Sequence, residues 1–267
     1  MAYEVRTPIT QAMTEGAISR KELKGLMKRS NRPAMIRIVI WIAMLSFTSY
    51  LIWLSMGTWF LLPAMLAHGI IIVHHFSLQH ECCHYTAFKT RKLNDIVGYT
   101  CGFSIILPHQ HFRYEHCDHH TYTNLNGKDP ELIKLPISVY KYIWYISAFP
   151  YWKNKFSEIL RHLLGQLSDD EKVYIPKQEQ GTIFKEARIM VFLYLIIFIG
   201  CILTDFWIPL WYWLFPLFLG EPIMRAIRLT EHVGRPNIDD LKENTRSSLV
   251  SYPMKFLCWN MNYHAEH

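Results

Sequence analysis

Charged residues are scarce in this chain of 267 residues: Asp, Glu, Lys and Arg make up 19%, whereas hydrophobic residues make up 51% and aromatic residues 15%. So apolar a composition is unusual for a soluble domain of this length and is typical of a membrane protein with one polar face. The net charge of +6 is modest, and Lys and Arg do not cluster on an otherwise polar surface. The composition therefore argues against a nucleic-acid-binding protein.

The sequence also lacks paired cysteines and an apolar leader. Cys82 and Cys83 are adjacent and the other four cysteines are scattered, so there is no CxxC metal knuckle. We expect reduced thiols, in the cytosol or in lipid, rather than a disulfide framework. Residues 1–36 are polar and basic, unlike a cleavable signal peptide, and Ser19–Ser30 is either a membrane-surface helix or a solvated tail. Because internal repeats and low-complexity tracts are absent, we expect a single domain over residues 1–267, with residues 1–36 as a basic cytoplasmic lead-in.

Four apolar runs are long enough to cross a bilayer as helices. The sequence predicts one hairpin of spans, Arg37–Met56 and Trp59–Leu78, and a second hairpin, Arg188–Thr204 and Phe206–Met224. The intervening residues 81–187 are mostly polar, and their shorter apolar stretches are expected to lie against the bilayer surface. We therefore predict an all-α integral membrane protein with four transmembrane helices and a helical cap.

Basic residues fall on one side of this predicted topology. The segment through Arg37 holds eight Lys and Arg residues, residues 81–188 hold fourteen and those after Met224 hold six, whereas the two short turns between paired spans hold none. The positive-inside rule therefore places both termini and the helical cap in the cytoplasm. The sequence contains no organelle signal and no fused electron-transfer module, which favours a bacterial inner membrane.

Fourteen histidines accompany these spans, and most gather at the predicted cytoplasmic edge. Residues three or four apart share one face of a helix, so the histidines of each group can converge. Imidazole is the commonest protein ligand for a metal ion, and it suits iron and zinc equally. The eight candidates are enough for two ions with about four ligands each: His80, His84, His116, His119, His120, His232, His264 and His267.

Acidic and amide residues accompany the histidine groups. A carboxylate that accepts the outer ring N–H of a ligating histidine fixes its tautomer and raises its basicity. The candidates for this role are Glu81, Asp118, Glu231, Glu266 and Asn260. The alternative is that the acids only solvate the polar face. The remaining histidines are expected to pack or to form hydrogen bonds rather than to ligate, namely His68, His74, His75, His109, His111 and His162.

These groups resemble the histidine boxes of the membrane fatty acid desaturase family, which also contains hydroxylases and ketolases. The family pattern is HxxxH, HxxHH and HxxHH with a lone histidine after a later span. It is matched here by His80–His84, by His116, His119 and His120, by His264–His267, and by His232. The flanking segments Thr121–Glu131 and Asn260–Tyr263 are also similar to the family, and the resemblance runs from the first span to the end of the chain.

The resemblance implies a non-haem di-iron centre that uses O₂ to introduce a double bond into a fatty acyl chain or acyl lipid. Electrons would come from an external donor of the ferredoxin or cytochrome b5 type. A hydroxylase or ketolase on the same scaffold is the alternative, and a membrane zinc hydrolase is a remote one. A metal transporter is less favoured still, because its ligands would lie near the bilayer midplane.

Two positions depart from the family pattern. The chain stops at His267, where the third box has one more histidine, so we expect this box to be truncated and the second metal site to be incomplete. Arg228 lies four residues before the lone histidine, where some acyl-CoA desaturases have a ligating Asn. Because a guanidinium cannot coordinate a metal, this chain is similar to the branch whose ligands are essentially all histidine.

Overall fold

The computed structural model describes residue 13 and residues 15–264, and these residues form helices, turns and loops without a strand. The helices are α2 (Arg20–Leu26), α3 (Arg32–Ser55), α4 (Leu61–Val73), α5 (His75–Cys83), α6 (Arg91–Ile105), α7 (His109–Tyr122), α8 (Val139–Ile146), α9 (Phe149–Leu163), α10 (Glu171–Tyr174), the 3₁₀ turn η1 (Lys177–Glu179), α11 (Gln180–Thr204), the π-helical turn η2 (Leu210–Leu214), α12 (Phe215–His232), α13 (Leu241–Asn244) and α14 (Tyr252–Leu257). The predicted all-α architecture is confirmed for this part of the chain.

Three of the described helical stretches are long and apolar enough to cross a membrane: Arg32–Ser55, Leu61–Cys83 and Lys177–Thr204. They correspond to three of the four predicted spans. The fourth predicted span, Phe206–Met224, is divided between the π-helical turn η2 and α12. Proline lacks the N–H that continues an α-helix, and prolines precede η2 and follow it at the start of α12. A fourth span therefore remains a prediction.

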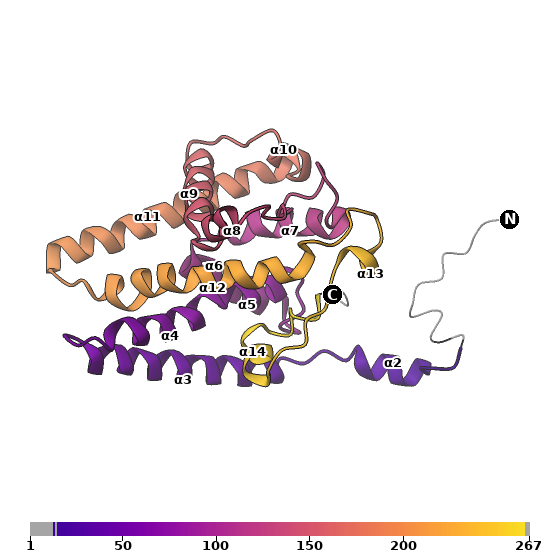
Figure 1. Ribbon diagram of the computed structural model, residues 1–267, viewed down its shortest axis with the longest axis horizontal. Coiled ribbons are helices and arrows are strands. Elements are labelled where there is room, and N and C mark those ends of the chain that lie inside the picture. Colours follow the sequence, from indigo (N-terminus) through magenta and orange to yellow (C-terminus); the bar gives the residue numbers. More distant parts are fainter. Residues whose placement is uncertain (1–12, 14, 265–267) are drawn as a thin grey trace.

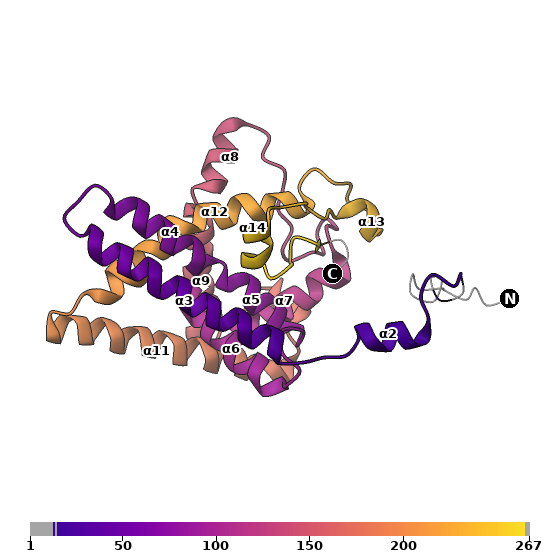
Figure 2. The same ribbon diagram turned by 90° about the horizontal axis from the view of Figure 1, so that it is seen from below.

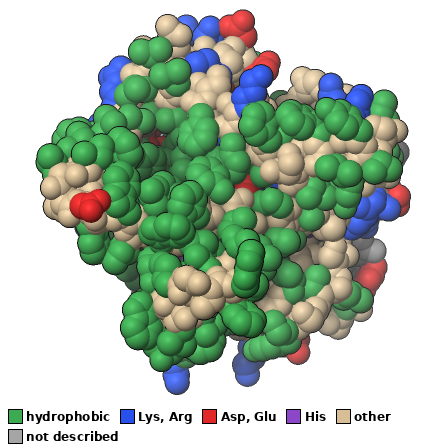
Figure 3. All heavy atoms as spheres, turned by 60° about the vertical axis from the view of Figure 1, so that its left-hand side comes forward, with side chains coloured by type: hydrophobic (Ala, Val, Ile, Leu, Met, Phe, Trp, Pro, Cys, Tyr) green, Lys and Arg blue, Asp and Glu red, His purple; other side chains and the backbone are tan. Residues whose placement is uncertain are grey.

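The long helices run side by side, and the turns from α3 to α4 and from α11 to α12 lie at the same end of the molecule (Figure 1). Helix α7 and the C-terminal segment lie toward the opposite end. The first end presents a mostly hydrophobic face with Lys and Arg near its edges (Figure 3). Apolar side chains are also exposed along the long helices, for example Phe47 of α3 and Phe192 and Leu203 of α11, at 61%, 61% and 78% of full exposure. So large an apolar surface fits contact with lipid.

The basic lead-in contains a short helix that extends away from the bundle (Figure 2). Ser19 caps α2, because its hydroxyl accepts from the Glu22 amide while the Glu22 carboxylate accepts from the Ser19 amide. No residue of α2 is buried, and Leu26 and Met27 are exposed. The helix is consistent with the predicted membrane-surface segment, and its contact with lipid stays a prediction.

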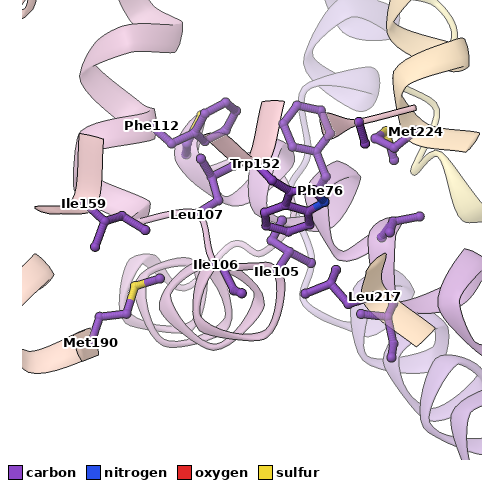
Figure 4. Close-up of a cluster of buried hydrophobic side chains, with 14 of the residues drawn as sticks. Phe76, Ile105, Ile106, Leu107, Phe112, Trp152, Ile159, Met190, Leu217 and Met224 are labelled. Carbon is purple, nitrogen blue, oxygen red and sulfur yellow. The ribbon is translucent and has the colours of Figure 1, made fainter. Parts of the chain in front are cut away.

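Close packing of α4 against α12 positions one side of the site. A Cβ atom added to Gly69 would lie 2.0 Å from the carbonyl oxygen of Pro216, and one added to Gly220 would lie 2.5 Å from backbone atoms of Gly69. Only glycine allows the two backbones to come so near, as in other pairs of membrane helices. Beside this contact, Leu217 and Met224 of α12 join the main hydrophobic core (Figure 4).

The same core connects the bundle to the helices of the middle region. Phe76 of α5, Phe112 of α7 and Trp152 of α9 pack in it together with Met190 of α11 (Figure 4). The polar residues 167–181 contain α10, where Glu171 is buried.

Candidate metal centre

The predicted histidines are delivered by four separate segments of the chain. His80 lies in the last turn of α5, and His84 is the C-terminal cap of the same helix. Helix α7 contributes three histidines from its C-terminal half, α12 ends at His232, and His264 follows α14. The one-turn spacing predicted for the first two groups is therefore confirmed.

The segment that leads to His264 is not α-helical, contrary to the sequence-based expectation that Asn260 lies one helical turn before His264. Residues 258–262 form turns, and Trp259 and Asn260 have φ angles of 51° and 68°. The Asn260 side chain is thus not one helical turn from His264, and the residue is exposed. His264 itself is buried, and it is brought to the site by the fold of the loop.

Four imidazoles form the first histidine group: His80, His84, His116 and His120. One ring nitrogen from each lies within 4.8 Å of the others. The Nε2 atoms of His116 and His120 are 3.0 Å apart, and the His80 and His116 rings are 4.4 Å apart between centroids. Ligands on opposite sides of an ion with bonds of 2.0–2.1 Å lie about 4.2 Å apart, so this group is close to the size of a coordination sphere.

Three imidazoles form the second histidine group: His119, His232 and His264, whose ligand atoms also lie within 4.8 Å of one another. The Nε2 atoms of His232 and His264 are 2.9 Å apart. The two groups adjoin, because the His80 and His264 ring centroids are 6.4 Å apart. The sequence predicted these histidines but not how they divide into two groups. His119 belongs with His232 and His264 rather than with the other two histidines of α7.

Acidic side chains hold the outer nitrogen of three of these rings. The Nδ1 atoms of His116 and His119 lie 2.7 Å from Glu131 Oε1 and 2.8 Å from Asp129 Oδ1, and His80 Nδ1 lies 3.3 Å from Glu81 Oε1. An ionised carboxylate only accepts, so Nδ1 is the donor in each pair. The Nε2 atoms are then left with a lone pair, which is the arrangement seen at histidine metal ligands.

Glu131 also connects the first group to α12. Its second oxygen accepts from Arg228 Nη2 at 2.5 Å, and Arg228 Nη1 donates to Glu231 Oε2 at 2.5 Å. Burial alone would raise the pKa of Glu131, but the adjacent His116 ring, which donates to it, and the Arg228 guanidinium outweigh burial and hold that pKa well below its usual range. Glu131 is therefore an ionised acceptor. Burial lowers the pKa of His116 more than Glu131 raises it, so this imidazole is neutral, as a metal ligand must be.

The predicted acidic neighbours have mixed outcomes. Glu81 contacts His80 as expected, whereas Glu231 contacts Arg228, and Asp118 lines a cavity. Glu266 and the predicted ligand His267 lie outside the residues that the structure describes. Sequence reasoning did not single out Asp129 or Glu131. Their only signal was their position in the family-like segment after the second box.

Most of the other histidines are hydrogen-bonded, as expected. Nδ1 of His68 pairs with Thr48 Oγ1, that of His74 with the Ile70 carbonyl, and that of His75 with Ser104 Oγ, each at 2.6 Å. His111 and His162 are not surface residues, and their burial agrees with the expected packing role. Both are fully buried and belong to a separate group of possible metal ligands.

The fold and these two groups define a helical membrane protein with a buried, histidine-rich site suited to two metal ions. A family model described as "Fatty acid desaturase" matches residues 53–267. Because the match covers most of the chain, the protein belongs to the fatty acid desaturase family.

Curated relatives match shorter segments. The chain is 34% identical over 90 residues to the chloroplastic omega-6 fatty acid desaturase of Spinacia oleracea, covering 32% of this chain and 20% of that protein. It is 35% identical over 77 residues to the sn-1 oleoyl-lipid 12-desaturase of Anabaena variabilis, covering 28% of this chain and 22% of that protein. A fatty acid desaturase of Bacillus subtilis is 29% identical over 97 residues, covering 34% of this chain and 27% of that protein. The matches thus span less than a third of each relative.

Proposed function

We propose that this protein is an O₂-dependent membrane desaturase that introduces a double bond into a fatty acyl chain or acyl lipid. The observation that carries the proposal is the convergence of seven imidazoles in two adjoining groups, with acidic side chains on the outer nitrogen of three of them. The names of the relatives support the substrate class.

The donor set fits two iron ions, one in each histidine group. When bound, they would supply the oxidising chemistry that removes hydrogen from an unactivated C–H bond, with electrons from an external ferredoxin or cytochrome b5 type donor. The chain's own residues hold and orient this centre. Glu131 and Asp129 fix the tautomers of His116 and His119, and the Phe112 ring stacks on His116 at 5.1 Å and excludes water there.

A cavity beside the first histidine group supports the proposed substrate. Its volume is about 340 Å³, and it reaches from Phe76, Leu107 and Phe112 to Glu131 and Arg228. The three apolar residues suit an acyl segment, whereas the opposite wall is charged. We propose that the acyl chain lies along the apolar wall, where Phe112 separates it from the His116 ring.

The location of the site follows from the same proposal. Basic residues are confined to the segments on one side of the predicted spans, which supports placing α7 and both histidine groups on the cytoplasmic side of a membrane, such as the bacterial inner membrane.

The direct test combines metal analysis with product analysis of the purified chain. We expect iron bound through imidazole ligands, with up to one ion in each histidine group, and a desaturated lipid when the chain is expressed in a host with a suitable donor. His80→Ala, His116→Ala and His264→Ala should each lose iron and product. His74→Gln, which changes a buried histidine outside both groups, should retain them. Stoichiometric zinc with hydrolytic activity would contradict the proposal.

A further inference from the structure

A separate cluster of ionisable side chains lies between α7, α9 and α10. His111 comes from α7, His162 from the last turn of α9 and Glu171 from α10. All three residues are buried: both histidines are 0% exposed and Glu171 is 4% exposed. One ligand atom from each lies within 4.8 Å of the other two, and none of the three belongs to the histidine groups described above.

The distances within this cluster match those around a small metal ion. Glu171 Oε1 lies 3.1 Å from His162 Nε2 and 3.7 Å from His111 Nε2. Ligands with bonds of 2.0–2.1 Å to a tetrahedral ion are about 3.3–3.4 Å apart. The hydroxyl of Tyr174 lies 3.2 Å from His111 Nε2, near a fourth position. Small side-chain movements would therefore suffice to close a coordination sphere.

The outer nitrogen of His111 repeats the pattern of the main site. His111 Nδ1 lies 3.3 Å from Glu158 Oε1, as His80 Nδ1 does from Glu81 Oε1. Lys155 donates to both oxygens of Glu158, at 2.8 and 3.0 Å, which keeps that carboxylate in place as an acceptor. The Glu158 carboxylate beside Nδ1 favours the tautomer with its proton on that nitrogen, which leaves the lone pair of His111 Nε2 directed toward Glu171 and Tyr174.

The protonation states of the cluster also suit a cation. Burial lowers the pKa of His111 to about 4, so its imidazole is neutral at pH 7. Burial alone would raise the pKa of Glu171, but hydrogen bonds from His162 and the Ser168 amide lower it to about 2. The Glu171 oxygen nearest the histidines also accepts from Arg161 Nη2 at 2.9 Å, so a bound ion would share this oxygen with Arg161.

A cavity gives a cation access to the cluster. Its volume is about 600 Å³, and Glu171, Tyr174 and Glu158 form part of its wall. Four further acidic residues line it, namely Glu115, Asp118, Asp129 and Asp170; burial raises the pKa of Glu115 to about 8, so the negative charge comes from the three aspartates. A concave surface lined mainly by one sign of charge concentrates counter-ions, here cations.

We propose that His111, His162 and Glu171 bind one divalent transition-metal ion, of the Zn²⁺, Fe²⁺ or Mn²⁺ class, that ties α7 to α9 and α10. Two imidazoles and one carboxylate are a donor set that these ions share. The remaining position is filled by the Tyr174 hydroxyl or by water from the acidic cavity. This site is distinct from both histidine groups, and the inference does not rest on the function proposed for them.

The test is cobalt binding to the full chain, purified in detergent and stripped of metal. Co²⁺ is added, unbound ion is removed and the equivalents per chain are measured. His162→Gln and Glu171→Gln should each bind one equivalent fewer than the parent chain. The matched control is Asp169→Asn, which changes a neighbouring carboxylate that is 97% exposed and should leave the count unchanged. Equal counts in the parent and both folded variants would overturn the proposal, whatever the histidine groups bind, because their contribution cancels.

Substitutions at buried positions can unfold the chain, so a second measurement uses the unmodified protein. Anomalous diffraction at the cobalt edge locates the ion without any variant. A peak within bonding distance of His162 Nε2 and Glu171 Oε1, about 2.0–2.3 Å, supports the site. A map with no peak there overturns it.

Discussion

Replacing Glu131 by Gln separates the charge of this side chain from its shape. The Glu131 carboxylate accepts from His116 Nδ1 at 2.7 Å and from Arg228 Nη2 at 2.5 Å. Glutamine has nearly the same size but no charge, and only one of its two terminal atoms can accept. The variant therefore keeps at most one of these contacts and leaves Arg228 with Glu231 as its remaining ion-pair partner.

Two effects of different size follow from this geometry. Loss of a partner to the outer nitrogen of a ligating histidine typically lowers metal affinity 10–100-fold, or about 1.4–2.7 kcal/mol. Breaking a buried ion pair by removing one partner costs about 3–5 kcal/mol of folding stability. Since Arg228 keeps its bond to Glu231, we expect the stability loss to fall toward the lower end of that range.

Metal affinity is measured by Co²⁺ titration against a competing chelator, on samples whose folding is checked by thermal unfolding. Glu131→Gln should weaken the first histidine group, and Asp129→Asn should weaken the second, because Asp129 holds His119. The control is Glu243→Gln, whose carboxylate is 63% exposed and lies 4.0 Å from Arg235 Nη2. This change should leave both metal affinities unchanged.

The reasoning is refuted by one clear result. If Glu131→Gln unfolds at a lower temperature but binds metal as tightly as the parent, then Glu131 serves only to hold α12 against the loop after α7 through its ion pair with Arg228. Its contact with His116 would then have no influence on the ligand.

Two further predictions concern packing and topology. Gly220→Ala should destabilise the chain by about 1–3 kcal/mol in thermal unfolding, because the added Cβ would clash with the backbone of Gly69. The control is Gly200→Ala, which should be tolerated because Gly200 has open space around it. Equal unfolding temperatures for the two variants would contradict the close approach of α4 and α12. Among the six cysteines only Cys117 is exposed, so an impermeant thiol reagent should label it from the side that carries α7, while a cysteine placed at Thr58 should react only from the opposite side.

The histidines that converge in the two groups were largely predictable from the sequence, and their acidic partners were not. His80 with His84, and His116 with His120, are one helical turn apart, so a local periodicity brings each pair to one face. Periodicity says nothing about the loop after α7. Asp129 reaches His119 because its second oxygen accepts from the Asn124 amide at 2.7 Å, a contact fixed by the turn itself.

Long-range placement explains the remaining differences. His119 joins a different group from His116 and His120 because α12 and the C-terminal loop bring His232 and His264 close to its ring. His111 and His162 are 51 residues apart along the chain, and only the packing of α9 and α10 on α7 places their ring centroids 4.8 Å apart. Their isolated positions in the sequence gave no signal of a shared site.

Arg228 illustrates how a position can change its role without leaving the site. Its guanidinium cannot ligate a metal, but it donates hydrogen bonds to Glu131 and to Glu231 at the same time. Through Glu131 it therefore acts on the His116 ring, so α12 influences the first histidine group by a charge rather than by a ligand.

Helix α7 is only 14 residues long, yet it contributes residues to both histidine groups and to the His111 cluster. Since a rigid helix cannot shift at one of these sites alone, a metal ion that fixes His111 to α9 and α10 would also restrict where His116, His119 and His120 can lie.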